Sequence, residues 1–183
     1  MKSSLYYSGV GSRSTPPEIL QLMTRTATVL ESYGYVLRSG GAPGADIAFE
    51  KGVKDVNNKE IWVPWIGFNS SPSNNIPSSE AYRIASTIHP AWQNLKESHK
   101  LLHSRNMHQV LGEDLNTPSA FVICWTEGAQ IIGGTATAIR LAKRHNIPVI
   151  NMGGFGQDVA NVKDGVECAL AAADPENLIS IEL

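Results

Sequence analysis

Three glycine-rich segments carry the residues best suited to bind a phosphorylated ligand. They are residues 8–13 (SGVGSR), 38–46 (RSGGAPGAD) and 133–137 (GGTAT). Glycines let a ligand approach the backbone, the hydroxyls of serine and threonine can donate to it, and the forked guanidinium of Arg13 can bind a phosphate. The second and third segments each lead into a predicted helix, whose free amides and dipole favour an anion. Together the three segments predict a cradle for a phosphate-bearing ligand.

Two common nucleotide-binding motifs are absent from the sequence. Gly9 and Gly11 are followed by Arg13 and Ser14, so the third glycine of the dinucleotide fingerprint G-x-G-x-x-G is missing. No Gly-Lys-Ser or Gly-Lys-Thr occurs, which excludes a Walker loop. The sequence therefore argues against an NAD dehydrogenase of the usual kind and against a P-loop NTPase.

Asp46 and Glu127 are the candidate catalytic residues, because they are the acids expected at strand-end loops of the cradle. Cleavage of an N-glycosidic bond needs a carboxylate near the anomeric carbon. Asp46 opens a predicted helix, where it could instead cap backbone amides or bind a ribose hydroxyl. Trp125 could stack on a base or belong to the core. Arg105 and Asn106 could meet a phosphate and a base edge, or cap a helix end.

The remaining candidates share a place in the glycine-rich segments or beside them. The predicted ligand-binding residues are Gly9, Gly11, Ser12, Arg13, Ser39, Gly40, Gly41, Ala42, Gly44, Arg105, Asn106, Trp125, Gly133, Gly134 and Thr135.

Metal binding and cysteine chemistry have little support. His99 and His103 are four residues apart on a predicted helix, but the sequence contains neither H-E-x-x-H nor C-x-x-C. Cys124 lies in an apolar strand segment and Cys168 in a helical one, so both are expected to be reduced core thiols. We expect no metal and no cofactor.

Short apolar runs alternate with helical patterns, which is typical of parallel strands joined by crossover helices. This rhythm predicts an α/β fold, a Rossmann-like three-layer sandwich with a mainly parallel sheet and helices on both faces. The predicted strands are Leu5–Val10, Tyr35–Arg38, Glu60–Trp65, Ala120–Trp125, Pro148–Met152 and Leu178–Glu182.

The helices have recognisable starts and buried faces. Thr15, followed by two prolines and Glu18, predicts a capped helix that Gly34 can close. Its apolar face contains Ile19, Met23, Ala27 and Leu30. Further helices are predicted to start within residues 41–46, near Ser79, after Pro90 (with Trp92, Leu95 and Leu102), at residues 133–135 and at about Asp158.

Residues 67–79 interrupt this rhythm with five serines, three asparagines and two prolines. The segment is too polar to pack and too rich in turn formers to be regular. It is either a solvated connection or a lid, since long loops in compact domains are often functional. No repeat or second composition regime occurs, so residues 1–183 are expected to form one domain.

Composition and charge narrow the class of protein. The formal charge is −2 and 42% of the 183 residues are hydrophobic, which fits a globular chain and argues against a broad basic face for duplex DNA. No apolar run is long enough to span a membrane, and no signal peptide is evident at the N-terminus. We therefore expect a cytoplasmic protein.

The glycine-rich segments, with Arg105 and Asn106, resemble the SLOG superfamily, which includes DNA-processing protein A (Smf) and the Lonely Guy phosphoribohydrolases. Residues 39–46 are similar to the S-G-G-A-x-G-x-D loop of DNA-processing protein A. Lonely Guy enzymes carry P-G-G-x-G-T-x-x-E with a glutamate implicated in catalysis, and no acid fills that position here. The resemblance implies a Rossmann-like fold with a nucleotide or nucleic-acid ligand at the glycine loops, and a possible homodimer.

Three functions follow as hypotheses. The first is a sensor or binding module for a nucleotide-derived small molecule, and the second is a nucleotide N-glycosidase. The third, implied by the resemblance to DNA-processing protein A, is single-stranded nucleic-acid binding, which needs a basic groove with aromatic platforms. Its groove would be built from Arg13, Arg38, Arg105 and Lys100, with Trp125 or Trp65 stacking.

Overall fold

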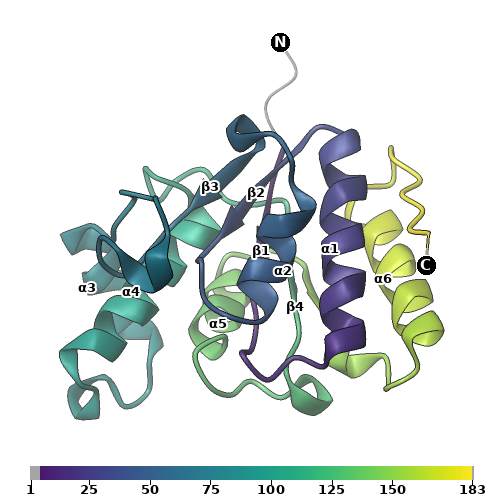
Figure 1. Cartoon of the computed structure of the whole chain (residues 1–183). Coiled ribbons are helices and arrows are strands. Elements are labelled where there is room, and N and C mark those ends of the chain that lie inside the picture. Colours follow the sequence, from purple (N-terminus) through teal and green to yellow (C-terminus); the bar gives the residue numbers. More distant parts are fainter. Residues whose placement is uncertain (1–4, 183) are drawn as a thin grey trace.

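The computed structural model describes residues 5–182 and contains a five-stranded parallel sheet in the order β3-β2-β1-β4-β5. The strands are β1 (Leu5–Gly9), β2 (Tyr35–Ser39), β3 (Lys59–Ile61), β4 (Phe121–Cys124) and β5 (Val149–Asn151). β1 pairs with β2 and with β4, and every pairing is parallel. The chain thus first builds outwards from β1 to β3 and then crosses back to β4 (Figure 1). β5 pairs with the far side of β4.

Six α-helices within the described residues cover both faces of this sheet. They are α1 (Pro17–Ser32), α2 (Ala45–Gly52), α3 (Ser79–Ile88), α4 (Glu97–Leu111), α5 (Ala136–Arg144) and α6 (Val159–Ala173). One core cluster joins α1, α2 and α6 to the sheet through Tyr7, Phe49 and Phe121, and a second joins α3, α4 and α5 through Val122 and Met107. The Rossmann-like three-layer prediction is confirmed.

α1 shows how the sequence specifies its own helix. Ile19, Met23, Ala27 and Leu30 are all buried, as their spacing predicts, and the chain leaves the helix at Gly34, whose φ is +86°. The predicted cap was wrong: Thr15 does not cap α1, because its hydroxyl instead donates to the carbonyl of Ser12 at 2.8 Å. That bond ties the helix entrance to the loop after β1.

The predicted sixth strand, Leu178–Glu182, is absent: this segment has no regular secondary structure in the part of the chain described. Ile179 and Ile181 are buried in the cluster beneath α1 and α6. The backbone amide of Ile181 donates to Glu167 of α6 rather than to a strand. The alternation of apolar residues correctly indicated that Ile179 and Ile181 are buried, but they are buried against helices and not within a sheet.

Two further boundaries differ from expectation. β3 ends at Ile61 rather than Trp65, since Trp62 makes only an isolated bridge with Asn75. The helix predicted after Pro90 begins only at Glu97, and Trp92 lies in a short 3-10 turn before it.

Residues 67–79 are held against the sheet edge at β3. Phe68 is buried in a 3-10 turn, so the expectation that nothing in this segment packs was wrong. Asn69 Nδ2 donates to the carbonyl of Gly41 at 3.0 Å, and Val63 donates its amide to the carbonyl of Asn75 at 2.8 Å. Whether the segment acts as a lid stays a prediction.

The two cysteines differ in environment. Cys124 is completely buried in β4, as expected, and burial raises the pKa of its thiol to about 12. Cys168 lies on the exposed side of α6, so its assignment to the core was wrong. No helix of the described chain is both long and apolar enough to cross a bilayer.

Candidate functional site

A cavity of about 530 Å³ lies where the carboxyl ends of β1 and β4 meet. The connections from these neighbouring strands run in opposite directions across the sheet, which leaves a crevice where ligands of open α/β sheets usually bind. Residues 10–14 after β1, 125–127 after β4 and 132–135 before α5 line it, with one face of α4. The cavity volume falls within the usual range for small-molecule sites.

α4 supplies the polar wall of this cavity. The lining residues on this helix are His99, Leu102, His103, Arg105, Asn106 and Gln109. Most of them recur at steps of three or four residues, which places them on one helix face. Met107, Val110 and Leu111 pack into the core instead.

Arg105 and Asp46 meet at the cavity as a buried ion pair. Arg105 Nη1 lies 3.3 Å from Asp46 Oδ2, and the two residues are 7% and 3% exposed. Nη1 also donates to the carbonyl oxygens of Gly40 and Trp62, whereas the buried Nε has no hydrogen-bond partner. Because Nε is closed to solvent, only the small exposed part of the guanidinium can reach a ligand, and that part lines the cavity.

Asp46 does not cap α2, although its place in the sequence suggested that it could. Burial raises the pKa of its carboxyl, and the Arg105 charge and the amide of Ala42 oppose that rise. The amide of Ala42 lies 3.4 Å from Oδ2. The side chain thus ties the second glycine-rich segment to α4.

Several glycines of the predicted cradle serve packing. A Cβ on Gly40 would lie 1.5 Å from Arg105 Nη1, so only glycine admits the guanidinium there. A Cβ on Gly9 would lie 2.6 Å from the ring of Phe49. Gly44, with φ +89°, would bring a Cβ within 2.7 Å of the carbonyl oxygen of Ser12. These close contacts explain why glycine occupies the three positions, without any need for a ligand.

Asn106 holds the third glycine-rich segment at the cavity. Its Nδ2 donates to the carbonyl of Gly134 at 2.9 Å and to Thr137 Oγ1 at 3.0 Å. A Cβ built on Gly134 would meet no atom within 4 Å. This loop, which opens α5, leaves room for a ligand beside its backbone.

The structure thus brings together most of the predicted site, from segments far apart in the chain. The predicted residues that line the cavity are Gly11, Ser12, Arg13, Ala42, Asp46, Arg105, Asn106, Trp125, Glu127, Gly133, Gly134 and Thr135. The predicted residues outside the lining are Gly9, Ser39, Gly40, Gly41 and Gly44. Ser39 is buried and donates its hydroxyl to the carbonyl of Gly9 at 2.7 Å, joining the ends of β1 and β2.

The lining also contains residues that the motifs did not predict. They are Val10, Ser14, His99, Leu102, His103, Gln109, Thr126, Ile132 and Ala138. The spacing of His99, His103 and Asn106 was the available signal, because polar residues at helical spacing mark either a solvated face or a wall of a polar cavity.

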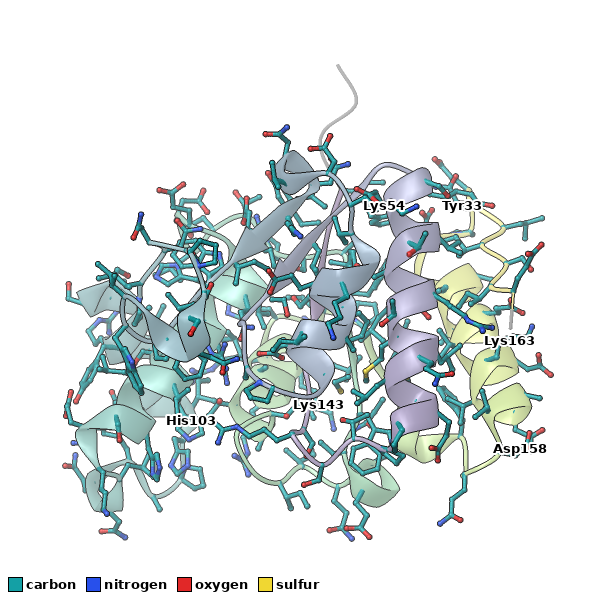
Figure 2. The ribbon with its side chains drawn as sticks, in the orientation of Figure 1. Tyr33, Lys54, His103, Lys143, Asp158 and Lys163 are labelled. Atoms are coloured by element: carbon teal, nitrogen blue, oxygen red, sulfur yellow. The ribbon has the colours of Figure 1, made fainter. Side chains whose placement is uncertain are left out.

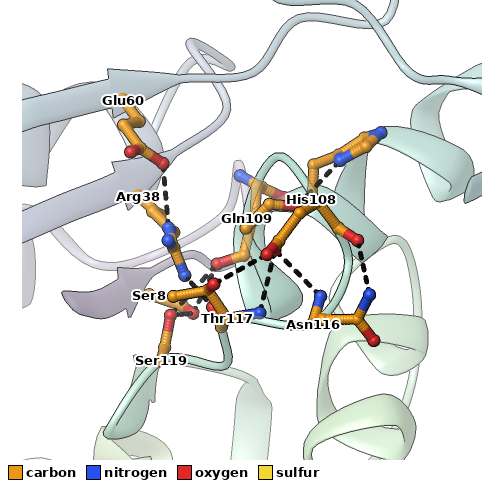
Figure 3. A network of polar contacts seen from close by, with 10 residues as sticks. Ser8, Arg38, Glu60, His108, Gln109, Asn116, Thr117 and Ser119 are labelled. Carbon is orange, nitrogen blue, oxygen red and sulfur yellow. Dashed lines mark hydrogen bonds and ion pairs between the residues drawn. The ribbon is translucent and has the colours of Figure 1, made fainter.

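Arg38 does not contribute to a basic groove, contrary to the expectation for nucleic-acid binding. It is 2% exposed, donates from Nε to Glu60 at 2.9 Å and from Nη1 to the carbonyl of Thr117 at 2.6 Å (Figure 3). Its guanidinium also lies 3.7 Å from the centre of the Tyr6 ring. Trp65 is 40% exposed but packs on Phe68 and does not line the cavity.

Among residues 5–182, no group of three or more His, Cys, Asp or Glu side chains is arranged to hold a metal ion. His103 Nδ1 lies 2.9 Å from Thr137 Oγ1, so a hydrogen bond to α5 orients this ring.

Comparisons with known proteins support the fold. No family model matches the chain, and no curated protein matches its sequence. The solved structure of DNA processing protein A from Helicobacter pylori, described for its single-stranded DNA binding mode, is similar to this chain with a TM-score of 0.51 and 16% sequence identity. The similarity covers 93% of this chain and 82% of that one.

Proposed function

We propose that this protein binds a nucleotide, or a phosphorylated molecule derived from one, in the cavity between β1 and β4. The observation that carries the proposal is that the guanidinium groups of Arg105 and Arg13 line the same cavity. Arg13 lines the same cavity, near enough for its charge to help lower the pKa of Arg105. Two neighbouring guanidinium groups favour an anionic ligand, which would relieve their repulsion.

The start of α5 adds donors suited to the same ligand. Gly133, Gly134 and Thr135 line the cavity just before the helix, where backbone amides have no partner within the helix. Such a helix start favours a phosphate. Trp125, at the end of β4, offers a ring on which a base could stack.

Single-stranded DNA is the second candidate, favoured by the similarity to a protein described for that binding. The charges support it less well. The chain has a net charge of −2, and of the four cations predicted for a groove, Arg13 and Arg105 line the cavity. Arg38 is engaged with Glu60 and Lys100 with Glu97, and neither of them lines it. We therefore place a small nucleotide first. Membership of the chain in the SLOG superfamily and its assembly into a homodimer are likewise proposals.

The N-glycosidase hypothesis rests on Asp46 and Glu127, both of which line the cavity. Asp46 is held by Arg105, so Glu127, which is exposed and follows β4, is the better placed of the two for attack or charge stabilisation at a sugar. Chromatography of each nucleotide after incubation with the protein would detect a released base.

Calorimetric titration with the four common ribonucleoside monophosphates tests the proposal. At least one should bind, and Arg13→Gln should weaken it by about ten- to hundredfold through loss of a charged contact. Lys54→Gln is the matched control, because Lys54 is exposed at the end of the molecule opposite His103 (Figure 2). Equal weakening by both variants, or no binding to any monophosphate, would overturn the proposal.

A thymidine oligomer distinguishes the second candidate. Binding that strengthens with strand length and falls with the logarithm of salt, at about −0.7 per phosphate contacted, would favour single-stranded DNA.

A further inference from the structure

A cluster of basic side chains lies at the outer part of the cavity, where His99 and His103 line it and His89 and Arg140 stand behind them. His103 and His99 line the cavity one turn apart on α4. The ring of His89, which follows α3, lies 4.6 Å from that of His103 between centroids. Arg140 of α5 is close enough to both His89 and His103 for its charge to lower their pKa values. Figure 2 marks the position of His103.

This cluster contains no carboxylate. The groups that face His103 are His99 and Arg105 from its own helix, His89 from the segment after α3, and Arg140 with Thr137 from α5. Among the ion pairs of residues 5–182, none includes Arg140 or any of these histidines. Arg140 also makes no hydrogen bond through its side chain within that part of the chain.

The electrostatic consequence is a cavity wall that disfavours further positive charge. Burial, helped by the charges around it, lowers the pKa of His103 to about 4. Burial and Arg140 also lower the pKa of His89. An anion bound here would reverse the effect, because a negative charge favours the protonated imidazole.

The position of the cluster along α4 determines what length of ligand could reach it. From Gln109 to His99, α4 runs ten residues along the cavity, which is about 15 Å at 1.5 Å per residue. Arg105 and Asn106 stand nearer the inner end, and His103 and His99 follow towards the start of the helix. A ligand anchored at Arg105 therefore has room to extend a second anionic group towards the histidines.

We propose that His99, His103 and Arg140 form a second anion subsite, so that the protein prefers a nucleoside diphosphate to the matching monophosphate. The inference rests on the proposed nucleotide-binding function of this cavity. The inner phosphate is held by Arg105, Arg13 and the start of α5, and the outer phosphate by the basic cluster. Binding of the outer phosphate draws a proton onto His103.

Paired titrations test the preference. Each of the four common ribonucleoside monophosphates is compared with its diphosphate, by calorimetry at pH 6 in two buffers of different ionisation enthalpy. The diphosphate should bind about tenfold or more tightly, since it gains charged contacts. The difference between buffers should report proton uptake for the diphosphate and less for the monophosphate.

Variants assign the preference to the cluster. Arg140→Gln and His99→Asn should each lower diphosphate affinity towards that of the monophosphate and leave monophosphate affinity within about twofold. His99 is exposed and Arg140 is half-buried, so both variants should fold, which circular dichroism checks. Lys143→Gln, an exposed charge change on α5, should leave both affinities unchanged.

The outcomes separate the two proposals. Monophosphate and diphosphate binding with equal affinity, or Arg140→Gln weakening both alike, would overturn the second subsite while leaving nucleotide binding intact. Failure of every mono- and diphosphate to bind would overturn both.

Discussion

Asp46 and Arg105 form a salt bridge between the first turn of α2 and the middle of α4, with 3.3 Å between Oδ2 and Nη1. Both side chains are almost completely buried, and the pair joins helices on opposite faces of the sheet. Any change to one partner leaves the other charged and poorly solvated. The pair is consequently both a structural contact and the base of the candidate site.

Asp46→Asn should therefore destabilise the protein, by about 3 kcal/mol, because an uncompensated Arg105 remains buried. Urea unfolding measures the loss. A helix cap at this position would tolerate asparagine, so an unchanged midpoint would contradict the ion-pair account. Arg105→Gln and the double variant complete a cycle, in which the double variant should cost less than the sum of the single changes.

Gly134→Val should block ligand binding while shifting the melting temperature little. A Cβ at Gly134 meets no atom within 4 Å, so the added side chain occupies cavity space. Gly40→Ala is the contrasting change: its Cβ would overlap Arg105 Nη1 and should lower both stability and binding. Nucleotide titration and thermal unfolding of the two variants test the contrast, and equal loss of stability in both would show that Gly134 is structural.

His103 should make the protein less stable in mild acid. Its pKa is lowered from 6.5 to about 4 in the folded chain, so between these values the unfolded state binds the extra proton. Acid thus favours unfolding, and this residue should remove about 2 kcal/mol between pH 7 and pH 5. Urea unfolding at the two pH values, in wild type and in His103→Asn, isolates its share. An identical pH dependence in the variant would refute the assignment.

The thiols should react in two distinct steps. Cys168 is exposed and should be alkylated in the native protein, whereas Cys124 is buried with its pKa raised to about 12 and should react only after unfolding. Mass spectrometry after iodoacetamide treatment should show one modification without urea and two with it. Two modifications in native buffer would contradict the burial of Cys124.

The elements of this fold could be predicted because their signals are local. The apolar face of α1 follows from helical periodicity, and β4 follows from a short continuous run of apolar residues. Glycine-rich loops at strand ends then predicted a site at the edge of the sheet where the cavity lies. The segment at Leu178–Glu182 failed because alternation reports burial and does not say whether a strand or a helix covers the residues.

The roles of individual glycines could not be predicted, because they depend on distant neighbours. Gly40 is glycine on account of Arg105, which lies 65 positions further along the chain. Arg38 was predicted to contribute to a basic groove, but its guanidinium is held by Glu60 and by the carbonyl of Thr117. The His99 and His103 pair was visible as spacing, but only the packing of α4 shows that it faces a cavity.

The segment that lies along β3 has a consequence for how the chain behaves at high concentration. Edge strands expose unpaired backbone groups, which can template pairing between molecules. Here Asn75 bridges to Trp62 just past the end of β3, and Ser73 donates its hydroxyl to the carbonyl of Ile61. The opposite edge, β5, has only three residues. Removal of residues 67–79 would uncover strand edge and favour sheet-mediated aggregation.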